Sequence, residues 1–114
     1  MDLDNRHCVP CEKGMPPLTE AQLHGFLKEL RTSWEVVTGK STGWRIKKEF
    51  TFPDFRHSIL FINKIAPLAE REGHHPDIYI FYNKVVIELW THKIGGLSEN
   101  DFILARKIEK LTLD

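Results

Sequence analysis

The strongest constraint on the fold of this chain is a pair of adjacent segments that are dense in strand-forming residues. The first, residues 77–82, contains Ile-Tyr-Ile-Phe-Tyr, and the second, residues 84–91, contains Val-Val-Ile-Glu-Leu-Trp. β-Branched and aromatic residues of this kind favour strands. Only Asn83 separates the two segments, so they are expected to pair as a β-hairpin.

A second hairpin and a first helix precede this pair in the sequence. Residues 34–37 and 44–52 are also β-branched and aromatic, and the turn-forming residues 39–43 lie between them, which again predicts a hairpin. Further upstream, Thr19 and Gln22 have the spacing of a capping box. This spacing predicts a helix that begins directly after Thr19.

A second helix is predicted between the two hairpins, with Asp54 capping its start and Gly73 its end. Pro67 lies inside this helix, where proline removes one backbone hydrogen bond and costs about 3 kcal/mol relative to alanine. We therefore expect either a kink near Asn63 or a helix that tertiary contacts hold in place. The expected core-facing residues are Phe55, Ile59, Ile62, Ala66 and Ala69, with Phe61, Ile65 and Leu68 widening this face.

A third helix follows Gly95 and Gly96, because Ser98 and Asp101 repeat the capping-box spacing. The element order is then α-β-β-α-β-β-α. Strands joined by short turns pair antiparallel, so the expected fold is α+β, a four-stranded antiparallel sheet with three helices on one face. The uncovered face and edge of so small a sheet need protection, which self-association into an oligomer would supply.

The domain organisation follows from length and local composition. A chain of 114 residues has room for one domain. Residues 1–17 lack hydrophobic periodicity and contain three prolines and Gly14, so we interpret them as a flexible N-terminal arm. Residues 18–114 then form the single domain.

Charge and cysteine content limit the expected binding partners and the expected cellular compartment. Sixteen Lys and Arg balance sixteen Asp and Glu, so we expect no direct binding of nucleic acid or of an anionic membrane. No run of about 18 apolar residues is present, which predicts no membrane span. Cys8 and Cys11 are too few for a disulfide framework, which favours a cytoplasmic location. They are interpreted as incidental thiols or as half of a site that another subunit completes.

Candidate catalytic side chains occur where the second helix ends and the next strand begins. His74, His75 and Pro76 lie at this junction, from which side chains project at the edge of a fold. Histidine can both donate and accept protons near neutral pH because its unperturbed pKa is about 6.5. On its own, this tripeptide is equally consistent with an ordinary surface loop.

Strand pairing would bring His92 to the same place. His92 ends the last expected strand, and in a hairpin the end of the second strand lies beside the start of the first. His75 and His92 are therefore expected at one edge of the sheet, with Asp101 one short loop away. The three histidines and Glu70 could instead bind zinc, but adjacent histidine side chains diverge, which makes a metal site the weaker interpretation.

A known signature contains these residues at the same spacing. Its members here are Glu70, His74, His75, Pro76, Tyr82, His92 and Asp101. Over nearly everything after the arm, the sequence resembles the pterin-4a-carbinolamine dehydratase family. The resemblance implies a homodimer or homotetramer with no metal and no organic cofactor. It also implies dehydration of a pterin substrate, 4a-hydroxytetrahydropterin, to quinonoid dihydropterin, in the recycling of tetrahydrobiopterin.

The resemblance also implies roles for individual residues. The catalytic residues would be His74, His75 and His92, and the substrate-binding residues would be Glu70, His75, Pro76 and Asp101. His74 and His92 would be the acid and the base, in an order left open, while Asp101 could orient or tune His92. The alternative function is a non-catalytic pterin-binding or protein-interaction module of the same fold, such as a coactivator or an assembly protein.

Overall fold

Both expected hairpins form and pair with each other in one antiparallel sheet. The computed structural model describes residues 3–10, 14–39 and 43–112. The strands are β1 (Glu35–Gly39), β2 (Gly43–Thr51), β3 (Asp77–Phe81) and β4 (Lys84–Leu89). Their order in the sheet is β1-β2-β4-β3, so the two central strands come from different hairpins.

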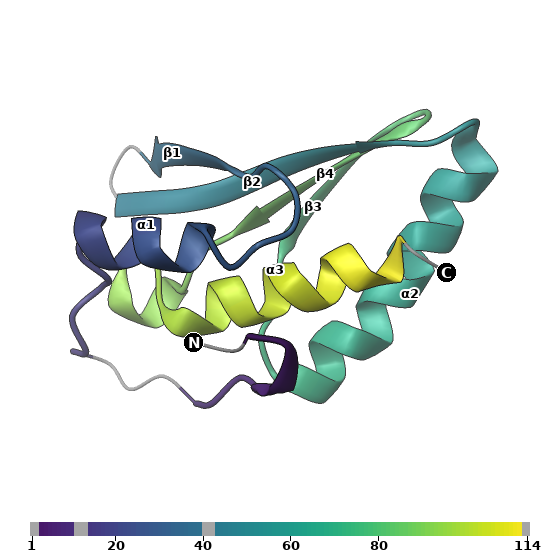
Figure 1. Cartoon of the computed structure of the whole chain (residues 1–114). Coiled ribbons are helices and arrows are strands. Elements are labelled where there is room, and N and C mark those ends of the chain that lie inside the picture. The colour runs from purple at the N-terminus through teal and green to yellow at the C-terminus, as the bar shows by residue number, and fades with distance from the viewer. Residues whose placement is uncertain (1–2, 11–13, 40–42, 113–114) are drawn as a thin grey trace.

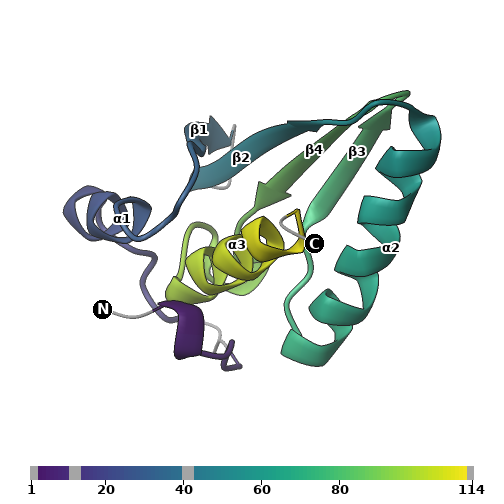
Figure 2. The same cartoon turned by 45° about the vertical axis from the view of Figure 1, so that its right-hand side comes forward.

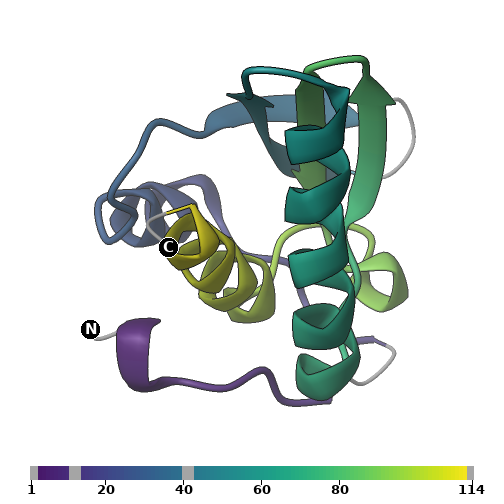
Figure 3. The ribbon, with the colours of Figure 1, turned by 90° about the vertical axis from the view of Figure 1, so that its right-hand side faces the viewer.

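Three α-helices cover one face of this sheet, as Figures 1 and 3 show. They are α1 (Glu20–Leu27), α2 (Phe55–Glu72) and α3 (Glu99–Leu111). The capping boxes predicted at Thr19 and Ser98 are both present, and Gly73 ends α2 in the left-handed conformation. The predicted fold class and element order are confirmed.

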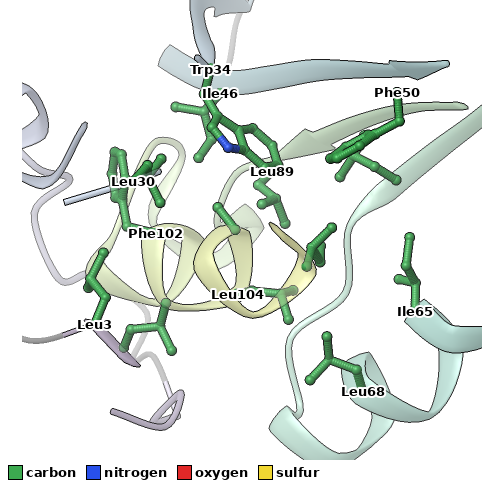
Figure 4. Packing of buried hydrophobic residues seen from close by; sticks show 14 of the residues in the cluster. Leu3, Leu30, Trp34, Ile46, Phe50, Ile65, Leu68, Leu89, Phe102 and Leu104 are labelled. Atoms are coloured by element: carbon green, nitrogen blue, oxygen red, sulfur yellow. The ribbon is translucent and has the colours of Figure 1, made fainter. Parts of the chain in front are cut away.

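The hydrophobic core lies between the sheet and α3. Every second residue of β4 from Val85 to Leu89 is buried, as are Ile46 and Phe50 of β2. Phe102 and Leu104 of α3 are fully buried beneath them (Figure 4). Each such side chain contributes roughly 1.5–3 kcal/mol relative to an exposed position. This packing fixes α3 in position, so the residues at its N-terminal end belong to a rigidly held helix.

The core-facing side of α2 differs from the predicted one. The buried residues are Ser58, Phe61, Ile65, Leu68, Ala69 and Glu72, whereas Phe55 is 49% exposed and Ala66 is exposed. The helix carries two adjacent apolar stripes, and the one that was expected only to widen the face packs on the core. α2 runs as a single helix through Pro67, and the buried residues on both sides of the proline hold it in place.

An apolar surface remains on the outer strand β3. Ile78, Tyr79, Ile80 and Phe81 are between 36% and 61% exposed, and β3 is at the edge of the sheet. Leu60 of α2 is also 48% exposed. Edge strands with exposed apolar side chains favour pairing with another chain.

The described part of the N-terminal arm packs against the helices. Residues Leu3–Asn5 form a short 3₁₀ helix, η1, with Leu3 buried in the core cluster. Nε of Arg106 in α3 lies 2.7 Å from Oδ1 of Asp4. From there the chain crosses to the C-terminal end of α2 (Figures 2 and 3). A flexible arm over residues 1–17 stays a prediction from composition, and contacts with the helices occur within residues 3–8.

Candidate active site

A cavity of about 460 Å³ opens at the end of the sheet where α2 gives way to β3. Gly73, in the left-handed conformation at φ 67°, turns the chain out of the helix, so that His74, His75 and Pro76 line the cavity. The strand register pairs Asp77, the first residue of β3, with Glu88 near the end of β4. The chain therefore leaves β4 at the same end of the sheet at which it enters β3. The expected convergence of all three histidines is confirmed, because His92 also lines this cavity.

The backbone at His92 differs from the prediction. β4 ends at Leu89, and His92 begins a 3₁₀ turn, η2 (His92–Ile94), instead of ending a strand. The backbone N–H of Thr91 donates to the carbonyl of Gly96 at 2.8 Å and closes this loop. Because of this loop, β4 stops at Leu89, and His92 lies near the junction between α2 and β3.

His74 makes its shortest polar contact with Asp101. Nε2 of His74 lies 2.6 Å from Oδ1 of Asp101. The Asp101 side chain is fully buried and that of His74 is 12% exposed. The other carboxylate oxygen accepts hydrogen bonds at 2.9 Å from the backbone N–H of Ser98 and from the hydroxyl of Thr91. Asp101 therefore acts on His74, and the expected contact with His92 is replaced by this one.

The geometry assigns a tautomer to His74. Both oxygens of an ionised carboxylate are acceptors, so Nε2 of His74 carries the proton in this contact. Nδ1 is then the ring nitrogen left to accept a proton. The Asp101 side chain is fully buried and is not among the described residues that line the cavity.

His92 is held by an aromatic stack. Its ring centroid lies 3.8 Å from that of Trp90, at an interplanar angle of 32°. The guanidinium carbon of Arg45 lies 4.6 Å from the centroid of the Trp90 ring, and Nε1 of Trp90 donates to Oδ2 of Asp77 at 3.1 Å. Trp90 and Asp77 also line the cavity, so the stack forms one wall and limits the orientations of His92.

The other predicted site residues are placed differently. His75 is exposed, and its Nε2 lies 3.4 Å from Oε2 of Glu70. Glu70 is exposed and is not among the described residues that line the cavity. Tyr82 lies in the turn between β3 and β4 with φ 50° and is 67% exposed, at the opposite end of the hairpin from the cavity.

The N-terminal arm also contributes to the cavity, which the sequence did not indicate. Cys8, Val9 and Pro10 line it. The backbone N–H of Cys8 donates to Oε1 of Glu72 at 2.8 Å, and burial, with the nearby negative charge of Glu72, raises the pKa of the Cys8 thiol to about 12. Burial also acts to raise the pKa of Glu72, but hydrogen bonds from Cys8 and His7 outweigh it, so this pKa is lowered.

Within residues 3–10, 14–39 and 43–112, no three His, Cys, Asp or Glu side chains are grouped closely enough to hold a metal ion. Cys11, half of the cysteine pair, lies outside the described residues. None of the described helices is long and apolar enough to cross a bilayer.

Comparisons with known proteins agree with this architecture. The family model described as Pterin 4 alpha carbinolamine dehydratase matches residues 16–111. A Rickettsia bellii protein named as a candidate pterin-4-alpha-carbinolamine dehydratase is 47% identical over 109 residues, covering 96% of this chain and 93% of that protein. A protein of the same name from Alkaliphilus metalliredigens is 39% identical, covering 96% of this chain and 95% of that protein.

Two solved structures are similar as well. The crystal structure of a transcriptional coactivator/pterin dehydratase from Brucella melitensis has a TM-score of 0.74 and 34% identity, covering 83% of this chain and 97% of that chain. A pterin dehydratase-like protein identified as a RuBisCO assembly factor in the alpha-carboxysome has a TM-score of 0.59 and 26% identity, covering 71% of this chain and 90% of that chain.

Proposed function

This chain belongs to the pterin 4 alpha carbinolamine dehydratase family, and on that premise we propose that it dehydrates 4a-hydroxytetrahydropterin to quinonoid dihydropterin. The observation that carries the proposal is the convergence of His74, held by buried Asp101, and His92 on one cavity. The reaction would serve tetrahydrobiopterin recycling, with no metal or organic cofactor involved.

The reaction needs one proton donor and one proton acceptor. The bond from C4a to the hydroxyl oxygen breaks as an acid protonates that oxygen, and water leaves. A base takes the proton from N5, and the electron pair of the broken N5–H bond forms the new double bond between N5 and C4a. No electrons enter or leave the system, so two imidazoles are sufficient, each contributing roughly 10²- to 10⁴-fold to the rate.

The three histidines differ in their surroundings, which supports different roles. His74 is nearly buried and fixed by a carboxylate, whereas His92 is exposed and fixed by stacking on Trp90. We assign the acid and base to this pair. His75 is more exposed than His74, and its ring is paired with Glu70, which suits contact with the pterin. Pro76 supplies an apolar part of the cavity wall.

The decisive experiment compares three alanine variants in the dehydration of freshly generated 4a-hydroxytetrahydropterin, followed optically. His74→Ala and His92→Ala should each reduce kcat by about 10²-fold or more. His57→Ala is the matched control, because His57 is also paired with a carboxylate, at 2.7 Å from Oδ1 of Asp54, but on the exposed first turn of α2. Wild-type rates in both site variants would refute the assignment.

The names of the related structures favour one alternative. A coactivator and an assembly factor occur among them, so this chain could be a non-catalytic pterin-binding or protein-interaction module. A folded wild-type protein that binds pterin without accelerating dehydration would support this alternative. Turnover that depends on His74 and His92 would exclude it as the sole function.

Self-association is part of the proposal. The exposed apolar side chains of β3 and Leu60 of α2 support a homodimer or homotetramer, in which these surfaces would be covered. Light scattering coupled to size exclusion measures the mass directly. Ile80→Lys, on the edge strand, should shift an oligomer towards the monomer. The sparse cysteine content supports a cytoplasmic location.

A further inference from the structure

The N-terminal arm forms one wall of the cavity. Cys8, Val9 and Pro10 line the same cavity as His74 and His92. The family model begins only at residue 16. The arm segment 8–10 therefore adds surface to the pterin site from outside the part of the chain that the family model matches.

Asn100 holds this segment through both ends of its amide group. Oδ1 of Asn100 accepts a hydrogen bond from the backbone N–H of Val9 at 3.0 Å, and Nδ2 donates to the carbonyl of Val9 at 2.6 Å. The Asn100 residue is only 4% exposed. A carboxamide is suited to this arrangement because it is donor and acceptor at once, whereas Asp would lose the donor and Leu would lose both.

Glu72 holds the adjacent residues of the arm. Its carboxylate accepts a hydrogen bond from the Cys8 backbone at 2.8 Å, and its other oxygen lies 3.0 Å from Nδ1 of His7. Glu72 precedes His74 by two residues, and Asn100 directly precedes Asp101. The two segments that carry the His74–Asp101 pair therefore also carry the two side chains that hold residues 7–9 of the arm.

We propose that residues 8–10 are a substrate-binding wall, held over the pterin cavity by Asn100 and Glu72, and that Asn100 is a positioning residue that sets affinity for the pterin. This inference rests on the proposed function. The wall contains no group that transfers a proton in the reaction, so its loss should weaken binding of substrate and leave the chemical step nearly intact.

The test uses Asn100→Leu in the full chain, with Glu99→Gln as the matched control. Leu preserves the approximate size of Asn and removes both hydrogen bonds to Val9. Glu99 is the neighbouring residue and pairs with Arg6 of the arm at the surface, where an ion pair contributes little. Asn100→Leu should raise KM about fivefold or more with kcat changed less than about twofold, while Glu99→Gln should change neither.

A second readout reports directly on the arm. The Cys8 thiol contacts the carbonyl of Asn100 at 3.6 Å and should be alkylated slowly by iodoacetamide in the wild type. Asn100→Leu should accelerate this alkylation, and 7,8-dihydrobiopterin, which cannot be dehydrated, should slow it in the wild type by covering the wall. Fragmentation of the peptide that spans residues 7–13 distinguishes Cys8 from Cys11.

A third variant keeps the inference testable if Asn100→Leu does not fold. Val9 is 65% exposed, so Val9→Gly removes part of the wall with little effect on packing and should also raise KM selectively. If the folded variants have unchanged KM and the wild type turns over normally, residues 8–10 do not bind substrate, and the proposed function is unaffected. A wild type that neither binds 7,8-dihydrobiopterin nor dehydrates the carbinolamine would overturn both the substrate-binding wall and the proposed function.

Discussion

Nε2 of His74 lies 2.6 Å from Oδ1 of Asp101, a carboxylate that is completely buried and that also caps α3. One side chain thus stabilises a helix and orients a candidate catalytic histidine. The two functions use different oxygens, because Oδ2 serves Ser98 and Thr91 and Oδ1 serves His74. The helix cap therefore also fixes the position of the oxygen that contacts His74.

Asp101→Asn should separate these two functions. The amide oxygen of Asn would take the place of Oδ2, because both of the partners there are donors, which puts the amide NH₂ opposite Nε2 of His74. His74 must then accept at Nε2 and carry its proton on Nδ1, the reverse of the wild-type tautomer. We expect kcat to fall about 10²-fold with the fold retained, measured by dehydration kinetics and by imidazole ¹⁵N chemical shifts.

The control for this substitution is Asp54→Asn. Asp54 also caps a helix and also contacts a histidine, His57, but on the exposed start of α2. Its replacement should lower stability slightly and leave turnover unchanged. Equal losses of activity in the two Asn variants would mean that capping alone, and not the His74 contact, accounts for the effect of Asp101.

Two variants of Trp90 test its support of His92. Trp90→Leu removes the aromatic partner of His92, an interaction of about 0.5–1.5 kcal/mol, and should reduce kcat up to about tenfold. Trp90→Phe loses the hydrogen bond to Asp77 but keeps a ring for His92 to stack on, so it should retain more activity than Trp90→Leu. Steady-state dehydration kinetics with a thermal-unfolding control measure this, and a Phe variant as slow as the Leu variant would contradict it.

Glu72 should make stability depend on pH through the arm. Its pKa is lowered in the folded chain, so its stabilising contribution is present above the unfolded value of about 4.3 and is lost as pH falls through the folded value. Urea unfolding of Glu72→Gln should therefore show a deficit relative to wild type at pH 7 that shrinks at pH 3.5. Glu70→Gln, which removes an exposed acid two residues earlier in α2, is the control, and a Glu72→Gln deficit no larger than that of Glu70→Gln would contradict the prediction.

Local chemistry made most of the fold predictable. The capping boxes at Thr19 and Ser98, the terminating Gly73 and the two hairpins each depend on residues a few positions apart, and each is present. The convergence of His74, His75 and His92 followed from antiparallel pairing, because register relates the two ends of a hairpin.

The remaining features depend on how elements pack in three dimensions. α2 has two apolar stripes, and only its orientation over the sheet decides that Phe61 and Ile65, and not Phe55, enter the core. The partner of Asp101 could not be chosen from the sequence, since His92 is nearer along the chain than His74. The contact between Val9 and Asn100 joins residues 91 positions apart, and no local sequence pattern predicts it.

Alanine substitution at two glycines, Gly43 and Gly25, should change the stability of the fold in opposite directions. Gly43, at the start of β2, has φ 71°, and a Cβ added there would lie 2.6 Å from the carbonyl oxygen of Gly95, in the loop that carries His92. Strained backbone and a contact with rigid backbone should make Gly43→Ala less stable by about 2–4 kcal/mol. Gly25 lies within α1 with open space around its Cα, so Gly25→Ala should gain about 0.5–1 kcal/mol. Urea unfolding of both variants measures these shifts. A Gly43→Ala protein as stable as wild type would mean that the start of β2 and the His92 loop do not approach each other as closely as described.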